Sequence, residues 1–149
     1  MALERSYEEF VDALQTADDE LAFERIARRV AERIGFRWFA YLHLSGDARA
    51  LISSYPKFWT RRYFDVGYER VDPIIQYAGR MNDVFIWDRR SPRISRNREQ
   101  RLFFDEAMSF GIMSGATVPI KCGFGRTAAF TFATDEGLAS TDRLATNAR

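Results

Sequence analysis

The chain has 149 residues, of which 46% are hydrophobic and 29% charged, so it is predicted to form one globular domain and not a disordered chain. A net charge of +1 provides no global field that would steer it to nucleic acid, and no stretch approaches the roughly 20 apolar residues of a membrane helix. A single cysteine excludes an internal disulfide, which suits a reducing cytoplasm, and one cysteine with one histidine is too few for a Cys/His zinc site. The acidic N-terminus is not typical of a signal peptide.

Two helices are predicted at the start of the chain. Residues 5–14 and 18–34 each carry apolar side chains at helical spacing on one face. Gly35 is a natural end for the second helix, and Thr16 with Asp19 three residues on forms a weak capping box. The sequence therefore begins with helical structure.

After residue 35 the spacing of the apolar residues changes to the two-residue period of strands. Residues 36–44 alternate with period two and are followed by turn residues, and residues 50–55 read as an antiparallel partner strand. Residues 57–64 are predicted as a short helix, and a second short helix over residues 73–80 has Pro73 in its first turn.

The second half repeats the alternation of helix and hairpin. Residues 83–88 form a short apolar segment, and residues 89–101 are a basic loop leading into a helix that ends at Gly111. Residues 115–120 and 126–134 predict another hairpin, and the last ten residues read as the beginning of a helix without an apolar face. Helices in runs between antiparallel strands indicate an α+β fold, in which a cavity can form between sheet and helices.

Catalytic motifs are weak in this sequence. His43 lies in the middle of a predicted strand, where a hydrogen-bonded or exposed strand residue is the simpler interpretation, and Cys122 has no second histidine to activate it. Gly123-Phe124-Gly125 precedes a strand, whereas a phosphate loop would open a helix. The arginine-rich run over residues 89–101 reads more simply as a solvated loop than as a phosphate contact.

The stretch WTRRYFDVGYERVDPI (59–74) has two interpretations. Trp59, Tyr63, Phe64 and Tyr68 can be ordinary core aromatics, and Asp72 before Pro73 can be an ordinary turn or cap residue. A buried tryptophan or tyrosine, however, needs a hydrogen-bond partner, and a buried aspartate is costly without one. Tyr55, Trp59 and Asp72 would together supply two donors and one acceptor, a set that suits a neutral amide with a carbonyl-containing head group.

The same residues resemble a known family. The motifs SSYPKFWTRRYFDVGYERVDPII, DVFIWD and FFDEAMSFGIMSGATVPI are similar to the autoinducer-binding domain of LuxR-type quorum-sensing transcription regulators, and in particular to the TraR-like branch of rhizobia and agrobacteria. The resemblance covers roughly residues 20–135. It implies an α/β/α sandwich around a five-stranded antiparallel sheet, with an N-acyl homoserine lactone bound between the sheet and the helices.

The resemblance also implies roles for individual residues. Trp59 would donate to the lactone carbonyl, Asp72 would accept the ligand amide N–H, and Tyr55 would donate to the acyl carbonyl. Thr131 matches the position that can reach a 3-oxo group, directly or through water. The pocket walls would be formed by Tyr63, Phe64, Ile74, Trp87, Phe103, Phe104, Ala107 and Ile112.

The expected partners follow from the same resemblance. Relatives continue into a helix-turn-helix domain, whereas this sequence ends at Arg149, so we expect no direct DNA binding and a chain incomplete at its C-terminus. We expect a non-enzymatic sensor without cofactor or metal that forms a homodimer, or a heterodimer with a full-length regulator that it would inhibit. Two other interpretations stay open: a PAS- or GAF-like sensor of another small molecule, and an acyl hydrolase that uses Asp72.

Overall fold

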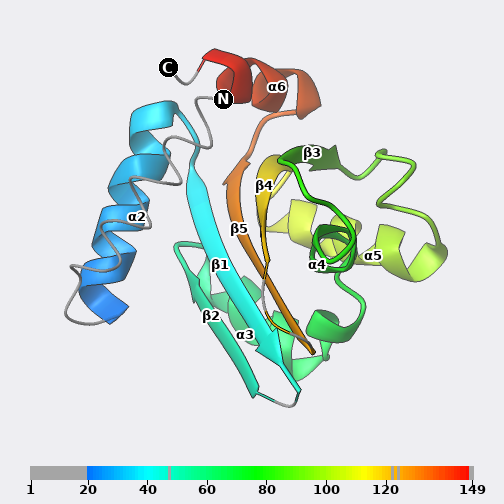
Figure 1. Ribbon diagram of the computed structural model, residues 1–149. Coiled ribbons are helices and arrows are strands. Elements are labelled where there is room, and N and C mark those ends of the chain that lie inside the picture. The colour runs from blue at the N-terminus through cyan, green and yellow to red at the C-terminus, as the bar shows by residue number, and fades with distance from the viewer. Residues whose placement is uncertain (1–19, 47, 122, 124, 148–149) are drawn as a thin grey trace.

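The computed structural model describes residues 20–46, 48–121, 123 and 125–147. A five-stranded antiparallel sheet in the order β2-β1-β5-β4-β3 lies between two layers of helices (Figure 1). Its strands are β1 (Trp38–Ser45), β2 (Ala48–Ser53), β3 (Phe85–Asp88), β4 (Ser114–Ile120) and β5 (Arg126–Thr134). The predicted α+β sandwich with about five antiparallel strands is confirmed.

The helices divide between the two faces of the sheet. The helix α2 (Glu20–Ile34) covers one face, and α6 (Leu138–Asn147) packs near the start of β4 (Figure 1). The other face is covered by α3 (Lys57–Asp65), the short 3₁₀ helix η1 (Tyr68–Arg70), α4 (Pro73–Ala78) and α5 (Arg98–Ser109). Each layer encloses its own hydrophobic cluster against the sheet.

The two faces of β5 differ in side-chain size. Because successive residues of a strand point to opposite faces, Phe130 and Phe132 face α2 and fill that side of the core. Ala129, Thr131 and Ala133 point to the opposite face, toward α3–α5. The aromatic face is closely filled, whereas the small side chains on the other face leave space between the sheet and its helices.

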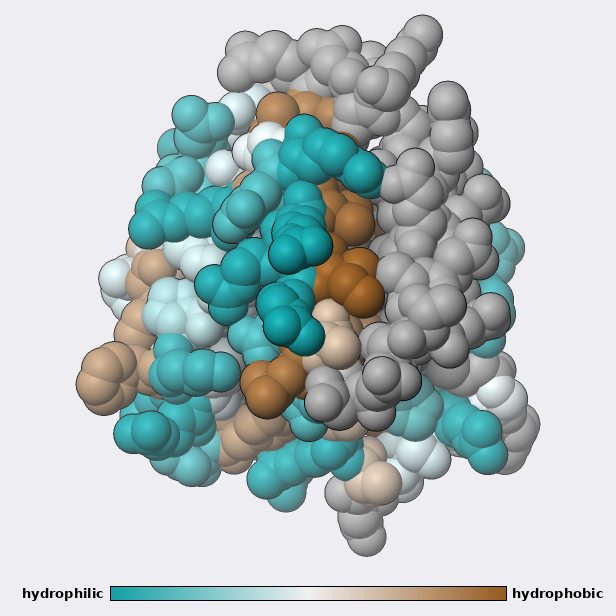
Figure 2. All heavy atoms as spheres, turned by 90° about the vertical axis from the view of Figure 1, so that its left-hand side faces the viewer, coloured by the Kyte–Doolittle hydropathy of each residue, from teal (hydrophilic) through white to brown (hydrophobic). Residues whose placement is uncertain are grey.

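The helix α2 is amphipathic. Phe23, Ala27, Val30 and Ala31 are buried against the sheet. Its outward positions are mostly charged, and Figure 2, turned so that this side faces the viewer, shows a strip of hydrophilic side chains on the surface. The spacing of these two sets is the 3.6-residue period that predicted the helix.

Most predicted elements are present within one to three residues of their expected bounds. The apolar segment over residues 83–88 supplies the edge strand β3, and η1 was not predicted. The expectation of a final helix without an apolar face is wrong, because Thr141 is fully buried and Leu144 packs beside Gly35. The predicted helix over residues 5–14 and the capping box at Thr16 lie outside the described residues. Among the described helices, none combines the length and apolarity needed to cross a membrane.

Candidate functional site

A pocket lies between the sheet and the α3–α5 layer. It contains about 600 Å³ of space free of atoms, a figure that includes open solvent. Its lining is mostly apolar and aromatic, with Asp72 and Thr131 as buried polar side chains. The lining residues are Ala40, Leu42, Leu51, Tyr55, Trp59, Tyr63, Asp72, Ile74, Ile75, Trp87, Phe103, Phe104, Ala107, Ile112, Ala129 and Thr131.

The fold brings together nearly all of the residues singled out from the sequence. Of the twelve predicted wall and anchor residues, eleven line this pocket and Phe64 does not. The Phe64 ring lies outside it, beneath the guanidinium of Arg49 and edge-on to Tyr63. The helical period explains this position, because Phe64 follows Tyr63 directly and points about 100° away from it around α3.

Five lining residues were missed by sequence reasoning: Ala40, Leu42, Leu51, Ile75 and Ala129. Four of them lie on strands β1, β2 and β5 and form the floor of the pocket. The signal that could have identified part of this floor is the alternation in RTAAFTFAT, which places small residues on one face and phenylalanines on the other.

Asp72 serves both the backbone and the pocket. Its Oδ1 accepts from the backbone N–H of Ile74 at 2.8 Å and of Ile75 at 3.4 Å, which caps the N-terminus of α4. Its Oδ2 accepts from the hydroxyl of Tyr63 at 2.7 Å. A carboxylate offers about four lone-pair sites, so Asp72 can accept a further hydrogen bond from a molecule in the pocket. The two interpretations of this residue, helix cap and pocket acceptor, are therefore compatible.

Burial controls the charge of Asp72. Removal of this carboxyl from water raises its pKa from 3.8 to about 6, although the hydrogen bonds from Tyr63 and from the α4 backbone act in the opposite direction. The carboxyl is mainly ionised at neutral pH, but its charge is only partly compensated. An additional N–H donor in the pocket would stabilise the ionised form.

Two donors border the pocket without a hydrogen-bond partner in the part of the chain that the structure describes. Among the described residues, no acceptor is hydrogen-bonded to the hydroxyl of Tyr55 or to the indole N–H of Trp59. Burial and the nearby charge of Asp72 raise the pKa of Tyr55 well above its ordinary value, which keeps its hydroxyl protonated. The Trp59 ring is fixed by Tyr63, Tyr68, Phe103 and Phe110, with ring centroids 5.6–6.0 Å away.

A chain of hydrogen bonds ends at Thr131 on the pocket floor. The indole N–H of Trp87 donates to Thr117 Oγ1 at 2.9 Å, and the hydroxyls of Thr117 and Thr131 lie 2.7 Å apart. Thr117 is fully buried. Among the described residues, Oγ1 of Thr131 is the atom that can accept the hydroxyl proton of Thr117. If Thr117 donates in this way, the proton of Thr131 is free to be donated into the pocket.

The absence of a side chain at Gly115 allows Trp87 to lie against β4. A Cβ atom at this position would lie 2.4 Å from Trp87 Cζ2 and 2.6 Å from the carbonyl oxygen of Phe132. The contact with a backbone oxygen could not be relieved by a change of rotamer. Gly115 therefore positions both the aromatic wall and the donor to Thr117.

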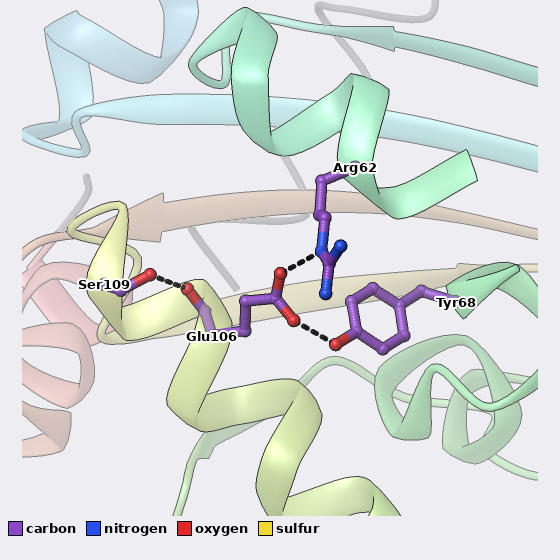
Figure 3. A network of polar contacts seen from close by, with 4 residues as sticks. All are labelled: Arg62, Tyr68, Glu106 and Ser109. Carbon is purple, nitrogen blue, oxygen red and sulfur yellow. Dashed lines mark hydrogen bonds and ion pairs between the residues drawn. The ribbon is translucent and has the colours of Figure 1, made fainter. Parts of the chain in front are cut away.

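A polar network joins the helices outside the pocket (Figure 3). The carboxylate of Glu106 on α5 accepts from Arg62 on α3 and from the hydroxyl of Tyr68 on η1. Burial and the bond to Glu106 raise the pKa of Tyr68 to about 12. Ser109 Oγ donates to the backbone carbonyl of Glu106 at 2.5 Å. Glu106 thus links α5 to α3 and η1, the elements that carry much of the aromatic wall.

The other candidates from the sequence lie elsewhere. His43 is half-buried in β1 and does not line the pocket, and Cys122 lies outside the described residues. In the basic run, Arg89 pairs with Asp105, and the arginine side chains are exposed. Within the described residues, no group of three or more His, Cys, Asp or Glu side chains is placed to hold a metal ion.

Taken together, the pocket combines a carboxylate acceptor, the hydroxyl and indole donors of Tyr55 and Trp59, the hydroxyl of Thr131 and a large apolar wall. This chemistry fits a neutral amphiphile that carries an N–H group and carbonyl oxygens near Asp72, Tyr55 and Trp59. The apolar remainder of the lining fits an alkyl chain.

Comparisons with known proteins give a consistent assignment. The family described as Autoinducer binding domain matches residues 19–148. The transcriptional activator protein TraR of Rhizobium radiobacter is 31% identical over 136 residues, which is 91% of this chain and 58% of that protein. The chain spans about half the length of the curated relatives it matches.

Solved structures agree in fold. The crystal structure of CepR2 from Burkholderia cenocepacia, described as an N-acylhomoserine lactone dependent LuxR family factor, has a TM-score of 0.76 at 22% identity and covers 95% of this chain and 84% of that one. SdiA in complex with octanoyl-rac-glycerol has a TM-score of 0.70 at 12% identity, covering 90% of this chain and 55% of that one. TraR and CepR2 are both described as transcription regulators. By the family match and the shared fold, this chain belongs to the autoinducer binding domains of LuxR-type regulators.

Proposed function

We propose that this domain binds an N-acyl homoserine lactone in the pocket between its sheet and helices α3–α5. The observation that carries the proposal is the grouping of Asp72, Tyr55 and Trp59 on one mostly apolar pocket. The ligand amide N–H would donate to Asp72, the acyl carbonyl would accept from Tyr55, and the lactone carbonyl would accept from Trp59. Bound ligand would thereby satisfy two donors that have no partner in the described protein.

Thr131 gives this proposal a chemical refinement. Its hydroxyl proton is free if Thr117 donates to it, so it could donate to an oxygen on the acyl chain. A 3-oxo substituent is such an oxygen. We therefore propose that a 3-oxo acyl chain binds more tightly than the unsubstituted chain of equal length.

The family relation supports a regulatory role for this binding. We propose that the domain acts as a non-enzymatic sensor without a cofactor and that it forms dimers, which sedimentation of the ligand-bound protein would detect. Hydrolysis is the enzymatic alternative, and product analysis after incubation with lactone would reveal it. Recovery of intact lactone would support the sensor assignment.

The test of the proposal is native mass spectrometry of the protein expressed with and without added N-acyl homoserine lactones. The expected result is a one-to-one complex whose amount falls in the Asp72→Asn variant. An octanoyl glycerol is the informative competitor, because a relative has been solved with one and it lacks the amide N–H. Equal retention of the glycerol ester and the lactone would contradict the amide-specific assignment, and retention of neither would contradict the proposal itself.

A further inference from the structure

The floor of the pocket ends at a defined row of the sheet. Side chains paired across β5, β1 and β2 form rows on the face toward α3–α5. Two successive rows supply the floor, namely Thr131 with Ala40, and Ala129 with Leu42 and Leu51. The next row contains Thr127, Leu44 and Arg49 and lines none of the pocket.

Arg49 crosses from this next row to the helical layer. Its Nη1 lies 2.5 Å from Oε1 of Glu69 on η1, and its guanidinium carbon lies 4.4 Å from the ring centroid of Phe64 on α3. Both partners belong to the helical layer that covers the pocket. Phe64 directly follows the lining residue Tyr63 on α3, and Glu69 lies on η1. Arg49 thus connects the sheet to its cover one row beyond the pocket floor.

Glu69 depends on this contact. Its side chain is only 11% exposed, and its Oε2 is buried without a hydrogen-bond partner among the described residues. Loss of Arg49 would leave a largely buried carboxylate without its cation, which is costly, so Glu69 would turn toward water. The ion pair that joins β2 to η1 would then be lost.

The anchor Tyr55 lies toward the opposite end of the floor. Tyr55 packs beside Trp38, with ring centroids 6.2 Å apart, and Trp38 precedes Ala40 on the same face of β1. Asp72 is close enough to Tyr55 to raise its pKa. A ligand with its head group at Tyr55 and its alkyl chain over Leu42 therefore extends toward Arg49.

We propose that Arg49, held by Glu69 and Phe64, is an end stop that limits the length of the acyl chain. This inference rests on the proposed function, because it assumes a ligand with a polar head and an alkyl tail. Chains that end at the row of Leu42 and Leu51 bind with the stop closed. Longer chains bind only if the contact between Arg49 and Glu69 breaks.

The test is a calorimetric series of N-acyl homoserine lactones that lengthen stepwise by methylene pairs. In the unaltered protein, affinity should rise by about fourfold per methylene until the chain meets the stop, and then fall. In Arg49→Ala the optimum should move to chains at least one methylene pair longer. Glu69→Ala removes the carboxylate that holds Arg49 in place and should shift the optimum in the same direction.

Arg61→Ala is the matched control, because Arg61 is exposed on α3 and lines no part of this pocket. It should keep the unaltered optimum. An unchanged optimum in folded Arg49→Ala that still binds short chains would overturn the end stop while leaving the proposed function intact. If Arg49→Ala does not fold, Glu69→Ala decides in the same way. If the unaltered protein binds no lactone of any length, the proposed function fails, and the end stop fails with it.

Discussion

Tyr63 donates a 2.7 Å hydrogen bond to Asp72 within the pocket, and the other oxygen of the same carboxylate caps α4. The bond joins α3 to the start of α4 and holds the acceptor at one edge of the aromatic wall. A residue that is needed for a helix cap is thereby also directed into the ligand pocket.

Asp72→Asn should weaken lactone binding by about 1.5–3 kcal/mol, or roughly ten- to a hundredfold, because a charge-assisted acceptor becomes a neutral one. Asparagine caps helices about as well as aspartate, so the fold should persist. Isothermal titration calorimetry measures the loss, with circular dichroism as the check on folding. The exposed Asp65→Asn is the control and should bind as the unaltered protein does.

Trp59→Phe should cost less than Asp72→Asn in the same assay. The change removes one neutral donor, worth about 0.5–1.5 kcal/mol, and keeps most of the contact with Phe103 and Phe110. The ranking of the two variants is the measured quantity. A larger loss for Trp59→Phe would mean that the indole does more than donate to a lactone carbonyl.

Binding should depend on pH through Asp72. Its pKa is about 6 in the folded protein against 3.8 ordinarily, so between these values the folded state holds more protons than the unfolded state. The contribution of Asp72 to the stability of the ligand-free protein therefore increases as the pH falls through this window, by at most about 1.4 kcal/mol per pH unit. A ligand N–H favours the ionised carboxylate, so affinity should decrease as the pH falls below 6.

Calorimetry at about pH 7.5 and about pH 5 measures this decrease, which cannot exceed roughly tenfold per pH unit for one proton. Asp72→Asn removes the titrating group and should flatten the profile. A profile of equal slope in both proteins would assign the dependence to another group.

Thr131→Val should reduce the preference for a 3-oxo chain over the unsubstituted chain. The change removes the proposed donor and preserves the shape of the side chain, and the loss should be about 0.5–1.5 kcal/mol for the 3-oxo ligand alone. The paired measurement with both ligands separates this effect from a general loss of packing. An equal change for both ligands would contradict a hydrogen bond to the acyl chain.

Gly115→Ala should destabilise the fold by about 1–3 kcal/mol, because its methyl group would overlap Trp87 and the backbone carbonyl of Phe132. Urea unfolding monitored by tryptophan fluorescence measures the change. Gly123→Ala is the control, since a methyl group there meets no heavy atom within 4 Å. Equal midpoints for the two variants would show that β4 can shift without cost.

Much of the site was predictable because the residues of one short segment are brought together by local structure. Trp59 and Tyr63 are spaced for one face of a helix, and Asp72 precedes a proline suited to a helix start. The joint position of Trp59 and Tyr63 follows from helical geometry, and the hydrogen bond from Tyr63 brings Asp72 to the same pocket. The family resemblance extended the set to Trp87, Phe103 and Thr131, which come from three other elements and line the same pocket.

The helical and strand periods, and with them the elements and the α+β class, can be read from the order of the residues, because side-chain spacing reflects which face of an element is buried. The folded structure sets which strands are neighbours, and hence that Ala40, Leu42 and Ala129 form the pocket floor. It also places Phe64 outside the pocket under Arg49 and packs the half-buried Leu144 of α6 against the core. These contacts join residues distant in sequence, and their pairing is set by packing across the whole core, which no local pattern encodes.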